Sequence, residues 1–261
     1  MKIPVIYIVG SGNLAWHLSE GLRSAGFQIK GIIARNQREG KKLSAVSACE
    51  YFKTIPDNID IPSLLFLCVS DDAIDELVEI IPNKKITLVH CSGMHPLLSA
   101  SGHADQRKYG VLYPVQSFNK KLKVSWNTIP VCIEAGDEST RKLLHAIARK
   151  IAGKVYRMDS ADRAYVHLAA VFANNFSNAL FAISQEVLQL RGIEFDILRP
   201  LILQTSLKVQ DSRPDTVQTG PALRSDLKTI RAHKKLLRET PEPGKIYNDL
   251  TRFIQHHFKK R

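Results

Sequence analysis

Two glycines near the start of the chain are spaced for binding the diphosphate of a dinucleotide. The sequence Gly10-Ser11-Gly12-Asn13-Leu14-Ala15 has the spacing GxGxxA and directly follows the apolar run 3–9. In such a turn the first glycine permits a tight bend, the second lets the main chain approach a pyrophosphate, and the small third residue lets a helix pack close to the strand. Backbone N–H groups at the helix start then face the anion. We therefore predict a dinucleotide site formed by Gly10, Ser11, Gly12, Asn13 and Leu14, with a purely structural turn as the alternative.

The end of the next strand-like run indicates which dinucleotide is bound. The run 29–34 ends in Arg35-Asn36, where sites specific for NAD usually place an acidic residue for the ribose hydroxyls. A guanidinium at this point suits a 2′-phosphate in both charge and geometry. Lys41, a few residues later, is read as an exposed helix residue. The sequence therefore predicts NADP(H) as the cofactor, with Arg35 and Asn36 in its site.

Polar residues also follow three later strand-like runs. The carboxyl ends of parallel strands lie at the edge of the sheet where a dinucleotide binds, so these residues are candidates for the same site. Two are ambiguous, because Asp71 could equally be a helix N-cap and His90 could equally be a hydrogen-bonded core histidine. The predicted cofactor contacts are Val69, Ser70, Asp71 and Ser92, and the predicted substrate contacts are His90, Gly93 and Gln116.

A stripe of uncharged polar residues lies on a long apolar helical run, 160–190. At about 100° per residue, His167, Asn174 and Asn178 share one face, with Asn175 beside them. Such groups among apolar neighbours need partners, so the stripe either links helices in a core or lines a cleft. Histidine exchanges protons near neutral pH. Our hypothesis makes His167 the proton donor, Asn174 the group that polarises a hydride-accepting carbonyl or imine, and Asn175 or Asn178 the group that orients substrate.

A second candidate for substrate binding is the segment Thr219-Gly220-Pro221, which is typical of a helix start. Free N–H groups there, together with Arg224 one turn later, could hold a carboxylate or a phosphate. The alternative is a capped helix in which Arg224 and Asp226 form structural ion pairs. The sequence leaves both interpretations open.

The elements that must position these residues form an α/β protein. Apolar strand-like runs alternate with helical stretches over residues 1–155, which predicts a doubly wound Rossmann domain with a mainly parallel sheet. Beyond this the strand signal ends, so residues 156–261 are predicted to be an all-α domain for substrate binding and dimerisation. The expected strands are 3–9, 29–34, 64–69, 86–91, 109–113 and 129–134. The expected helices are 13–25, 38–47, 72–81, 138–152, 160–190 (ended by Gly192), 194–210, 221–238 and 246–258.

Composition narrows the function classes. Of 261 residues, 37 are Lys or Arg and 25 are Asp or Glu, but the excess of positive charge is spread over both halves. The densest basic group is Lys228, Arg231, Lys234, Lys235 and Arg238, which at helical spacing indicates a solvated face; nucleic-acid binding is therefore a minor alternative. The four cysteines show no CxxC spacing, so neither a metal site nor a disulfide is expected. The run 3–9 is too short to span a membrane, and we expect a cytoplasmic protein.

Several of these motifs together resemble a known superfamily. The turn from Gly10 to Ala15, Arg35-Asn36, Val69-Ser70-Asp71 and His90-Cys91-Ser92-Gly93, followed by a long helix, resemble the pyrroline-carboxylate reductases and β-hydroxyacid dehydrogenases. The runs 167–176 and 218–226 are similar to bacterial Rossmann-like NADP oxidoreductases with a C-terminal domain of unknown function. This resemblance covers nearly the whole chain. It implies a Rossmann fold, an NADP cofactor and a homodimer formed through the helical domain, but no substrate.

One departure from the superfamily affects the chemistry. β-Hydroxyacid dehydrogenases place a catalytic lysine on the first long helix after the Rossmann domain, whereas no lysine occurs here between Tyr156 and Leu207. Pyrroline-carboxylate reductases need no comparable acid, because the nitrogen of their imine can already be protonated. We therefore predict an NADP(H)-dependent oxidoreductase acting on a small, anionic carbonyl or imine. The alternative is a protein that senses NADP(H) without turning it over.

Overall fold

The structure is a computed structural model that describes residues 3–82, 84–98 and 106–258. The chain divides into two compact units, Met1–Asn175 and Phe176–Arg261. The sequence places the boundary at residue 155 instead, because the predicted strands end before it. In the structure β8 (Lys154–Arg157) crosses that position and belongs to the sheet, and His167, Asn174 and Asn175 belong to the first unit.

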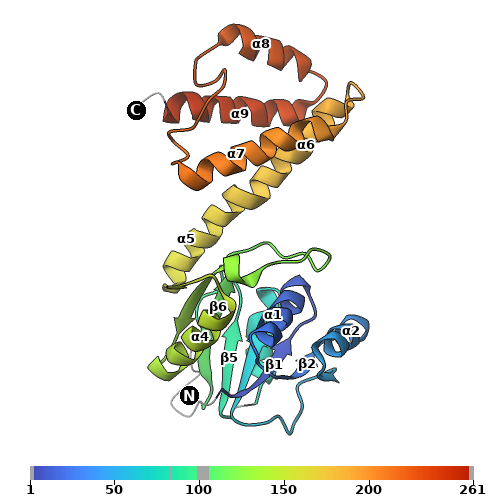
Figure 1. Cartoon of the computed structure of the whole chain (residues 1–261), viewed down its shortest axis with the longest axis vertical. Coiled ribbons are helices and arrows are strands. Elements are labelled where there is room, and N and C mark those ends of the chain that lie inside the picture. Colours follow the sequence, from blue (N-terminus) through green and yellow to red (C-terminus); the bar gives the residue numbers. More distant parts are fainter. Residues whose placement is uncertain (1–2, 83, 99–105, 259–261) are drawn as a thin grey trace. The chain divides into compact units, whose positions relative to one another are not determined.

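The first unit is built on one sheet with the strand order β3-β2-β1-β4-β5-β6-β7-β8 (Figure 1). Neighbouring strands are parallel except β6 and β7, which are antiparallel, so the predicted doubly wound, mainly parallel sheet is confirmed. The central strands β4 and β5 are buried along their whole length, as expected for strands covered on both faces. The strands are β1 (Val5–Val9), β2 (Ile29–Ile33), β3 (Glu50–Phe52), β4 (Ser63–Leu67), β5 (Ile86–His90), β6 (Lys108–Pro114), β7 (Pro130–Ala135) and β8 (Lys154–Arg157).

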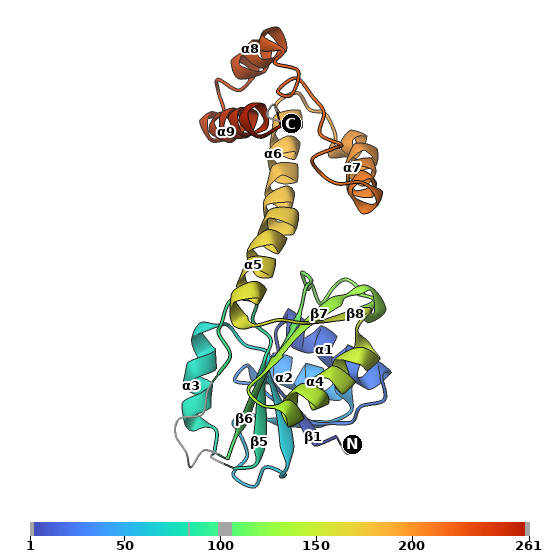
Figure 2. The ribbon, with the colours of Figure 1, turned by 90° about the vertical axis from the view of Figure 1, so that its left-hand side faces the viewer.

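Helices cover both faces of this sheet (Figure 2). On one face α1 (Asn13–Ser24), α2 (Gln37–Ser47) and α4 (Glu138–Ile151) bury their apolar sides, as the burial of Leu18, Leu43 and Ile147 shows. On the other face α3 (Asp72–Ile80) packs through Ile74. All four helices lie within one residue of their predicted bounds. They leave the carboxyl ends of the strands uncovered at the edge where α1 and α2 begin.

The sequence did not predict the two outermost strands, β3 and β8. Both are short and only partly buried, and β8 begins with Lys154 and ends with Arg157. A strand at the edge of a sheet does not need apolar residues on both faces. It therefore lacks the continuous apolar run that marks the central strands.

A long helical run follows the sheet and contains a segment of π-helix. It comprises α5 (Ser160–Ala170), a π-turn (Val171–Phe176) and α6 (Ser177–Gln189), and Gly192 lies just beyond in a left-handed conformation, as predicted. A π-helix closes its hydrogen bonds over five residues instead of four. The rotation of about 100° per residue is therefore interrupted, and the predicted stripe does not continue in register from His167 to Asn178.

The described part of the second unit is helical, as predicted, but its helix boundaries differ from the predicted ones. It contains α7 (Arg199–Asp211), α8 (Leu227–Leu236) and α9 (Pro241–His257). The sequence places a break at Pro241, whereas this proline begins α9. Proline is tolerated in the first turn of a helix, since the N–H group that it lacks has no partner there.

The helical run 160–189 is apolar enough and long enough to cross a membrane. Length and composition alone are weak support for such a span. None of its most apolar 18-residue window is buried in the structure.

Candidate functional site

The candidate site is a cleft of about 770 Å³ at the carboxyl ends of β1, β2 and β4. This size is typical of a small-molecule site. The turns that follow the three strands form its walls, because parallel strands place their carboxyl ends at one edge of the sheet. It is lined by the predicted cofactor residues Gly10, Ser11, Gly12, Asn13, Leu14, Arg35, Asn36, Val69 and Ser70.

The two glycines of the first turn are required for different reasons. Gly10 has a φ of +116°, and a Cβ on it would lie 2.2 Å from the carbonyl oxygen of Cys68, so the fold itself requires a glycine. Gly12 has ordinary extended backbone angles, and a Cβ on it would meet nothing within 4 Å. Neither conformation nor packing within the chain explains a glycine at position 12. It leaves bare main chain facing the cleft.

The start of α1 is suited to an anion. Its first turn holds no acidic residue, and no side chain caps its N–H groups. Helix N-termini carry partial positive charge and unpaired N–H donors. The bare main chain at Gly12 and the uncapped start of α1 therefore fit the pyrophosphate of a dinucleotide.

The structure adds cleft residues that the sequence did not indicate. Lys53, Thr54 and Ile55 follow β3, and four residues of α3 also line the cleft: Ala73, Glu76, Leu77 and Ile80. Lys53 was missed because β3 was not predicted, so nothing marked it as the end of a strand. It lines the same cleft as Arg35. Asn36 also lines the cleft, but its side-chain oxygen accepts a hydrogen bond from the backbone N–H of Glu39 and caps α2.

Asp71 and Ser92 are not among the described residues that line the cleft. The Ser92 hydroxyl donates to the Asp71 carboxylate at 2.8 Å and accepts from the backbone N–H groups of Met94 and His95 at 3.0 and 2.8 Å. These bonds engage the hydroxyl within the fold, and contact of Asp71 and Ser92 with a cofactor stays a prediction. The pair joins the start of α3 to the loop after β5.

His90 lies in the core, which is what one of its two sequence interpretations, a hydrogen-bonded core histidine, expects. Its side chain is fully buried, Nδ1 accepts from the backbone N–H of Ser92 at 3.2 Å, and Nε2 lies 3.1 Å from the carbonyl of Pro96. Burial, together with the positive charge of Arg163 and the nearby His95, lowers its pKa to about 3. Both ring nitrogens of the neutral imidazole are therefore used within the fold.

Acidification is expected to weaken the fold through His90. Because its pKa is lowered from 6.5 to about 3, the unfolded chain binds a proton that the folded chain excludes between these pH values. The stabilisation is present above pH 6.5 and is lost as the pH falls toward 3, which amounts to roughly 2 kcal/mol at pH 5. Urea unfolding at pH 7 and pH 5 measures this loss. The loss should shrink in His90→Asn but not in His256→Asn, which alters an exposed histidine; equal losses in all three proteins would contradict the assignment.

Gly93 and His167 are in contact with each other, and neither is among the described residues that line the cleft. A Cβ on Gly93 would lie 2.6 Å from Nδ1 of His167, so only a glycine lets the imidazole lie against this turn. The same Nδ1 is 3.1 Å from the hydroxyl of Tyr113, and the two rings meet edge to face. Tyr113 is buried at the end of β6, and burial raises its pKa, so the phenol keeps its proton. The sequence did not single out this partner of His167.

Asn174 and Asn175 lie in the π-turn and are exposed, and neither is among the described residues lining the cleft. π-turns are rare within helices and frequently occur at functional sites. Asn178 is exposed in the second unit. Gln116 is exposed, and its side-chain oxygen accepts from the backbone N–H of Ser117, so it stabilises its own turn.

The helix start predicted at Gly220 does not form. Gly220 has a φ of +109° in a turn, and α8 begins only at Leu227, where the Asp226 carboxylate accepts from the N–H of Thr229. The backbone N–H groups of Arg224 and Asp226 donate to the carbonyls of Gly220 and Pro221. The predicted helix start is therefore wrong, whereas binding of a carboxylate or phosphate by Gly220 and Arg224 stays a prediction.

The sheet order, the glycine turn and the cleft define a Rossmann-like protein. A protein from Bacteroides fragilis, whose name assigns it provisionally to the NADP oxidoreductases, is 34% identical, with a TM-score of 0.89 over 97% of this chain and 98% of that one. A family model described as a domain of unknown function (DUF2520) matches residues 129–254. The chain therefore belongs to the family of the Bacteroides fragilis protein, within the Rossmann-like NADP oxidoreductase superfamily.

More distant structures share the fold. A reductive aminase from Aspergillus terreus, in complex with NADPH and ethyl-5-oxohexanoate, is 12% identical, with a TM-score of 0.70 over 99% of this chain and 95% of that one. A pyrroline-5-carboxylate reductase from Coxiella burnetii is 13% identical, with a TM-score of 0.54 over 97% and 99% of the two chains. No curated protein matches this chain.

Proposed function

We propose that the chain is an NADP(H)-dependent oxidoreductase that transfers hydride to or from a small, anionic carbonyl or imine. The observation that carries the proposal is Gly12, whose lack of a side chain serves nothing within the protein and leaves main chain open to a ligand. The uncapped start of α1 lies in the same turn. Family membership and the NADPH-bound structures with the same fold support this cofactor.

Arg35 and Lys53 support NADP(H) over NAD(H). Both line the cleft, at the ends of the adjacent strands β2 and β3. Two cations suit the 2′-phosphate that distinguishes NADP from NAD, and the planar guanidinium can bind it through two parallel hydrogen bonds. No acidic residue follows β2 where one would bind the ribose hydroxyls of NAD.

His167 is the residue that we propose to transfer the proton. When bound, the cofactor supplies or accepts the hydride. The Tyr113 hydroxyl is within hydrogen-bond distance of Nδ1 of His167. When the phenol donates to Nδ1, the neutral imidazole carries its proton on Nε2. In this form the Nε2–H group can donate a hydrogen bond to the oxygen or nitrogen of the substrate. Transfer of that proton requires the ring to take up a second proton from water, so that the imidazolium gives one proton from Nε2 and is left neutral. Asn174 and Asn175, in the π-turn of the same helical run, are proposed to polarise and orient the substrate.

His167→Ala is expected to lower the turnover number by about 100-fold or more, because general acid catalysis typically contributes at least that factor. Tyr113→Phe should have a smaller effect of about 10-fold, since it removes one hydrogen bond to Nδ1 and leaves the imidazole in place. NADPH oxidation with a panel of keto acids, imines and aldehydes measures both. His256→Ala is the matched control at an exposed histidine. Unchanged turnover in His167→Ala would refute the assignment.

The rival proposal is a protein that senses NADP(H) without turning it over. It is favoured by the absence of a lysine between Tyr156 and Leu207 and by the exposure of Asn174 and Asn175. The same panel separates the two proposals. Multiple turnovers with any substrate support the enzyme, whereas tight NADPH binding with every substrate inert supports the sensor.

We also propose that the chain forms a homodimer through its helical part and works in the cytoplasm. Large apolar side chains are unusually exposed there, among them Tyr165 (75%), Phe172 (62%) and Leu201 (61%). Exposed apolar surface of this kind marks an interaction site, and a second copy is the commonest partner. All four cysteines are free, which suits a reducing compartment. Light scattering at micromolar concentration tests the dimer; a monomer would contradict it.

A further inference from the structure

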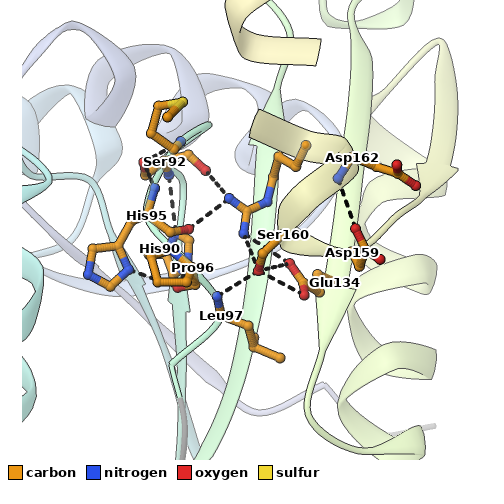
Figure 3. Close-up of polar contacts among 11 residues, drawn as sticks. His90, Ser92, His95, Pro96, Leu97, Glu134, Asp159, Ser160 and Asp162 are labelled. Carbon is orange, nitrogen blue, oxygen red and sulfur yellow. Dashed lines mark hydrogen bonds and ion pairs between the residues drawn. The ribbon is translucent and has the colours of Figure 1, made fainter. Parts of the chain in front are cut away.

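Arg163 is the largest fully buried side chain among the described residues, and no catalytic role has been assigned to it. Its guanidinium contacts Ser92, His95, Glu134 and Ser160, which are labelled in Figure 3. Nη1 donates to the backbone carbonyls of Ser92 and His95 at 3.1 and 2.8 Å. Nη2 donates to the Glu134 carboxylate at 2.9 Å and to the Ser160 hydroxyl at 3.1 Å.

Stability alone is a poor explanation for this arrangement. Removing a guanidinium and a carboxylate from water costs several kcal/mol, and apolar residues of similar size often serve as well or better in a buried position. The cost is increased by Nε of Arg163, which is buried and has no hydrogen-bond partner among the described residues. Buried ion pairs are retained in some proteins because they specify one arrangement. The arrangement specified here is the position of a loop.

The loop is 92–97, and Arg163 connects it to the helix that carries His167. Arg163 and His167 are four residues apart on α5, so they lie one turn apart on the same side of the helix. The carbonyls that Arg163 holds flank Gly93, the residue that lies against the His167 ring. Ser160, at the start of α5, also accepts from the backbone N–H of Leu97 at 2.9 Å. These hydrogen bonds therefore hold the loop 92–97 in place against α5.

The same loop is tied to the cofactor cleft. The Ser92 hydroxyl donates to Asp71 at 2.8 Å, and Asp71 directly follows Ser70, which lines the cleft. A chain of hydrogen bonds thus runs from the rim of the cleft through Ser92 to Arg163 and the helix of His167.

We propose that Arg163 is a positioning residue. By holding the turn at Gly93 against α5, it keeps Nδ1 of His167 within hydrogen-bond distance of the Tyr113 hydroxyl. This hydrogen bond selects the imidazole tautomer that carries its proton on Nε2. The value of this tautomer for catalysis rests on the proposed function. The geometry that produces the tautomer does not depend on the proposed function, and the tautomer can be measured in the protein without cofactor or substrate.

The test is the tautomer ratio of His167, measured by ¹⁵N NMR of the imidazole nitrogens in the full-length protein. Arg163→Lys keeps the charge beside Glu134, but an ammonium cannot span the carboxylate and both carbonyls as the planar guanidinium does. We expect the ratio of the Nε2–H to the Nδ1–H form to fall about 5-fold, which corresponds to the loss of one hydrogen bond of ~1 kcal/mol. Tyr113→Phe should cause the same fall. The double variant should fall no further, because both changes remove one interaction.

Arg157→Lys is the matched control, since Arg157 is exposed on β8, and it should leave the ratio unchanged. A folded Arg163→Lys variant with the wild-type ratio would overturn the proposal. If circular dichroism shows that this variant is unfolded, Glu134→Gln removes the charged partner while keeping the side-chain volume, and an unchanged ratio there would equally overturn it. NADPH binding and turnover are measured separately. If the protein binds no NADPH but its variants show the expected tautomer ratios, the proposed function is refuted and this inference stands.

Discussion

Gly12→Val is expected to abolish NADP(H) binding while leaving the fold intact. A Cβ at this position meets no protein atom within 4 Å, and the backbone angles are ordinary for any residue, so the fold can accept a side chain. The branched side chain would instead occupy the space where the main chain approaches the pyrophosphate. We expect at least a ~100-fold rise in the dissociation constant, which is about 2.7 kcal/mol, with the melting temperature within a few degrees of the wild type. Calorimetry and thermal unfolding measure the two effects.

Gly10→Ala provides the contrast. The left-handed backbone at Gly10 costs roughly 1–3 kcal/mol for a residue with a side chain, and the added Cβ would lie 2.2 Å from the Cys68 carbonyl. This variant should lose stability as well as cofactor. If Gly12→Val binds NADPH like the wild type, or if it loses as much stability as Gly10→Ala, the assignment of Gly12 to the cofactor is wrong.

Replacing Arg35 with alanine is expected to weaken NADP(H) binding by about 10-fold to 100-fold, because hydrogen bonds to charged groups contribute 1.5–3 kcal/mol. NAD(H) has no 2′-phosphate, so its affinity should remain within a factor of about three, as near-neutral surface changes allow. The selectivity for NADP(H) should therefore fall. Arg38→Ala is the matched control, since Arg38 is exposed and is not among the described residues lining the cleft.

The outcome also distinguishes the two cations of the cleft. If Arg35→Ala leaves selectivity unchanged and Lys53→Ala removes it, then Lys53 holds the 2′-phosphate. Equal weakening of NADP(H) and NAD(H) by either variant would contradict a role in selecting between them.

The sequence predicted the parts of the fold that are buried on both faces. β4 and β5 are nearly continuous apolar runs because helices cover both faces of the sheet. Three of the four helices between the strands start at a capping side chain (α2 and α4) or at the glycine turn (α1). The short edge strands β3 and β8 carry no such signal. Without β3, nothing in the sequence placed Lys53 beside Arg35.

The candidate site was predictable only where a local motif fixes the backbone. The residues of the glycine turn and Arg35 could be predicted from their local sequence, and all of them line the cleft. His90, Ser92 and Asp71 lie at or just after the ends of strands in the same way, but their polar atoms bond within the loop after β5 or between that loop and Asp71. Tyr113 and Arg163 contact His167 and the loop 92–97 across 54 to 71 positions of sequence, a distance at which local patterns predict nothing.

The π-turn illustrates a further limit. An α-helical projection places His167, Asn174 and Asn178 on one face, and this projection fails once the hydrogen bonding changes at Val171. Polar residues within an apolar helical run are compatible with an α-helix or a π-helix, because their spacing in the sequence is the same in both. Only the backbone shows where the helix widens.

Calorimetric titration of the wild-type protein with NADPH and with NADH tests the central claim most directly, because the proposed oxidoreductase function requires a dinucleotide in the cleft. We expect NADPH to bind with a dissociation constant of about 1 μM to 100 μM, which is −8 to −5.5 kcal/mol, and NADH to bind at least ~10-fold more weakly. Folded protein that binds neither dinucleotide at millimolar concentration would contradict the account.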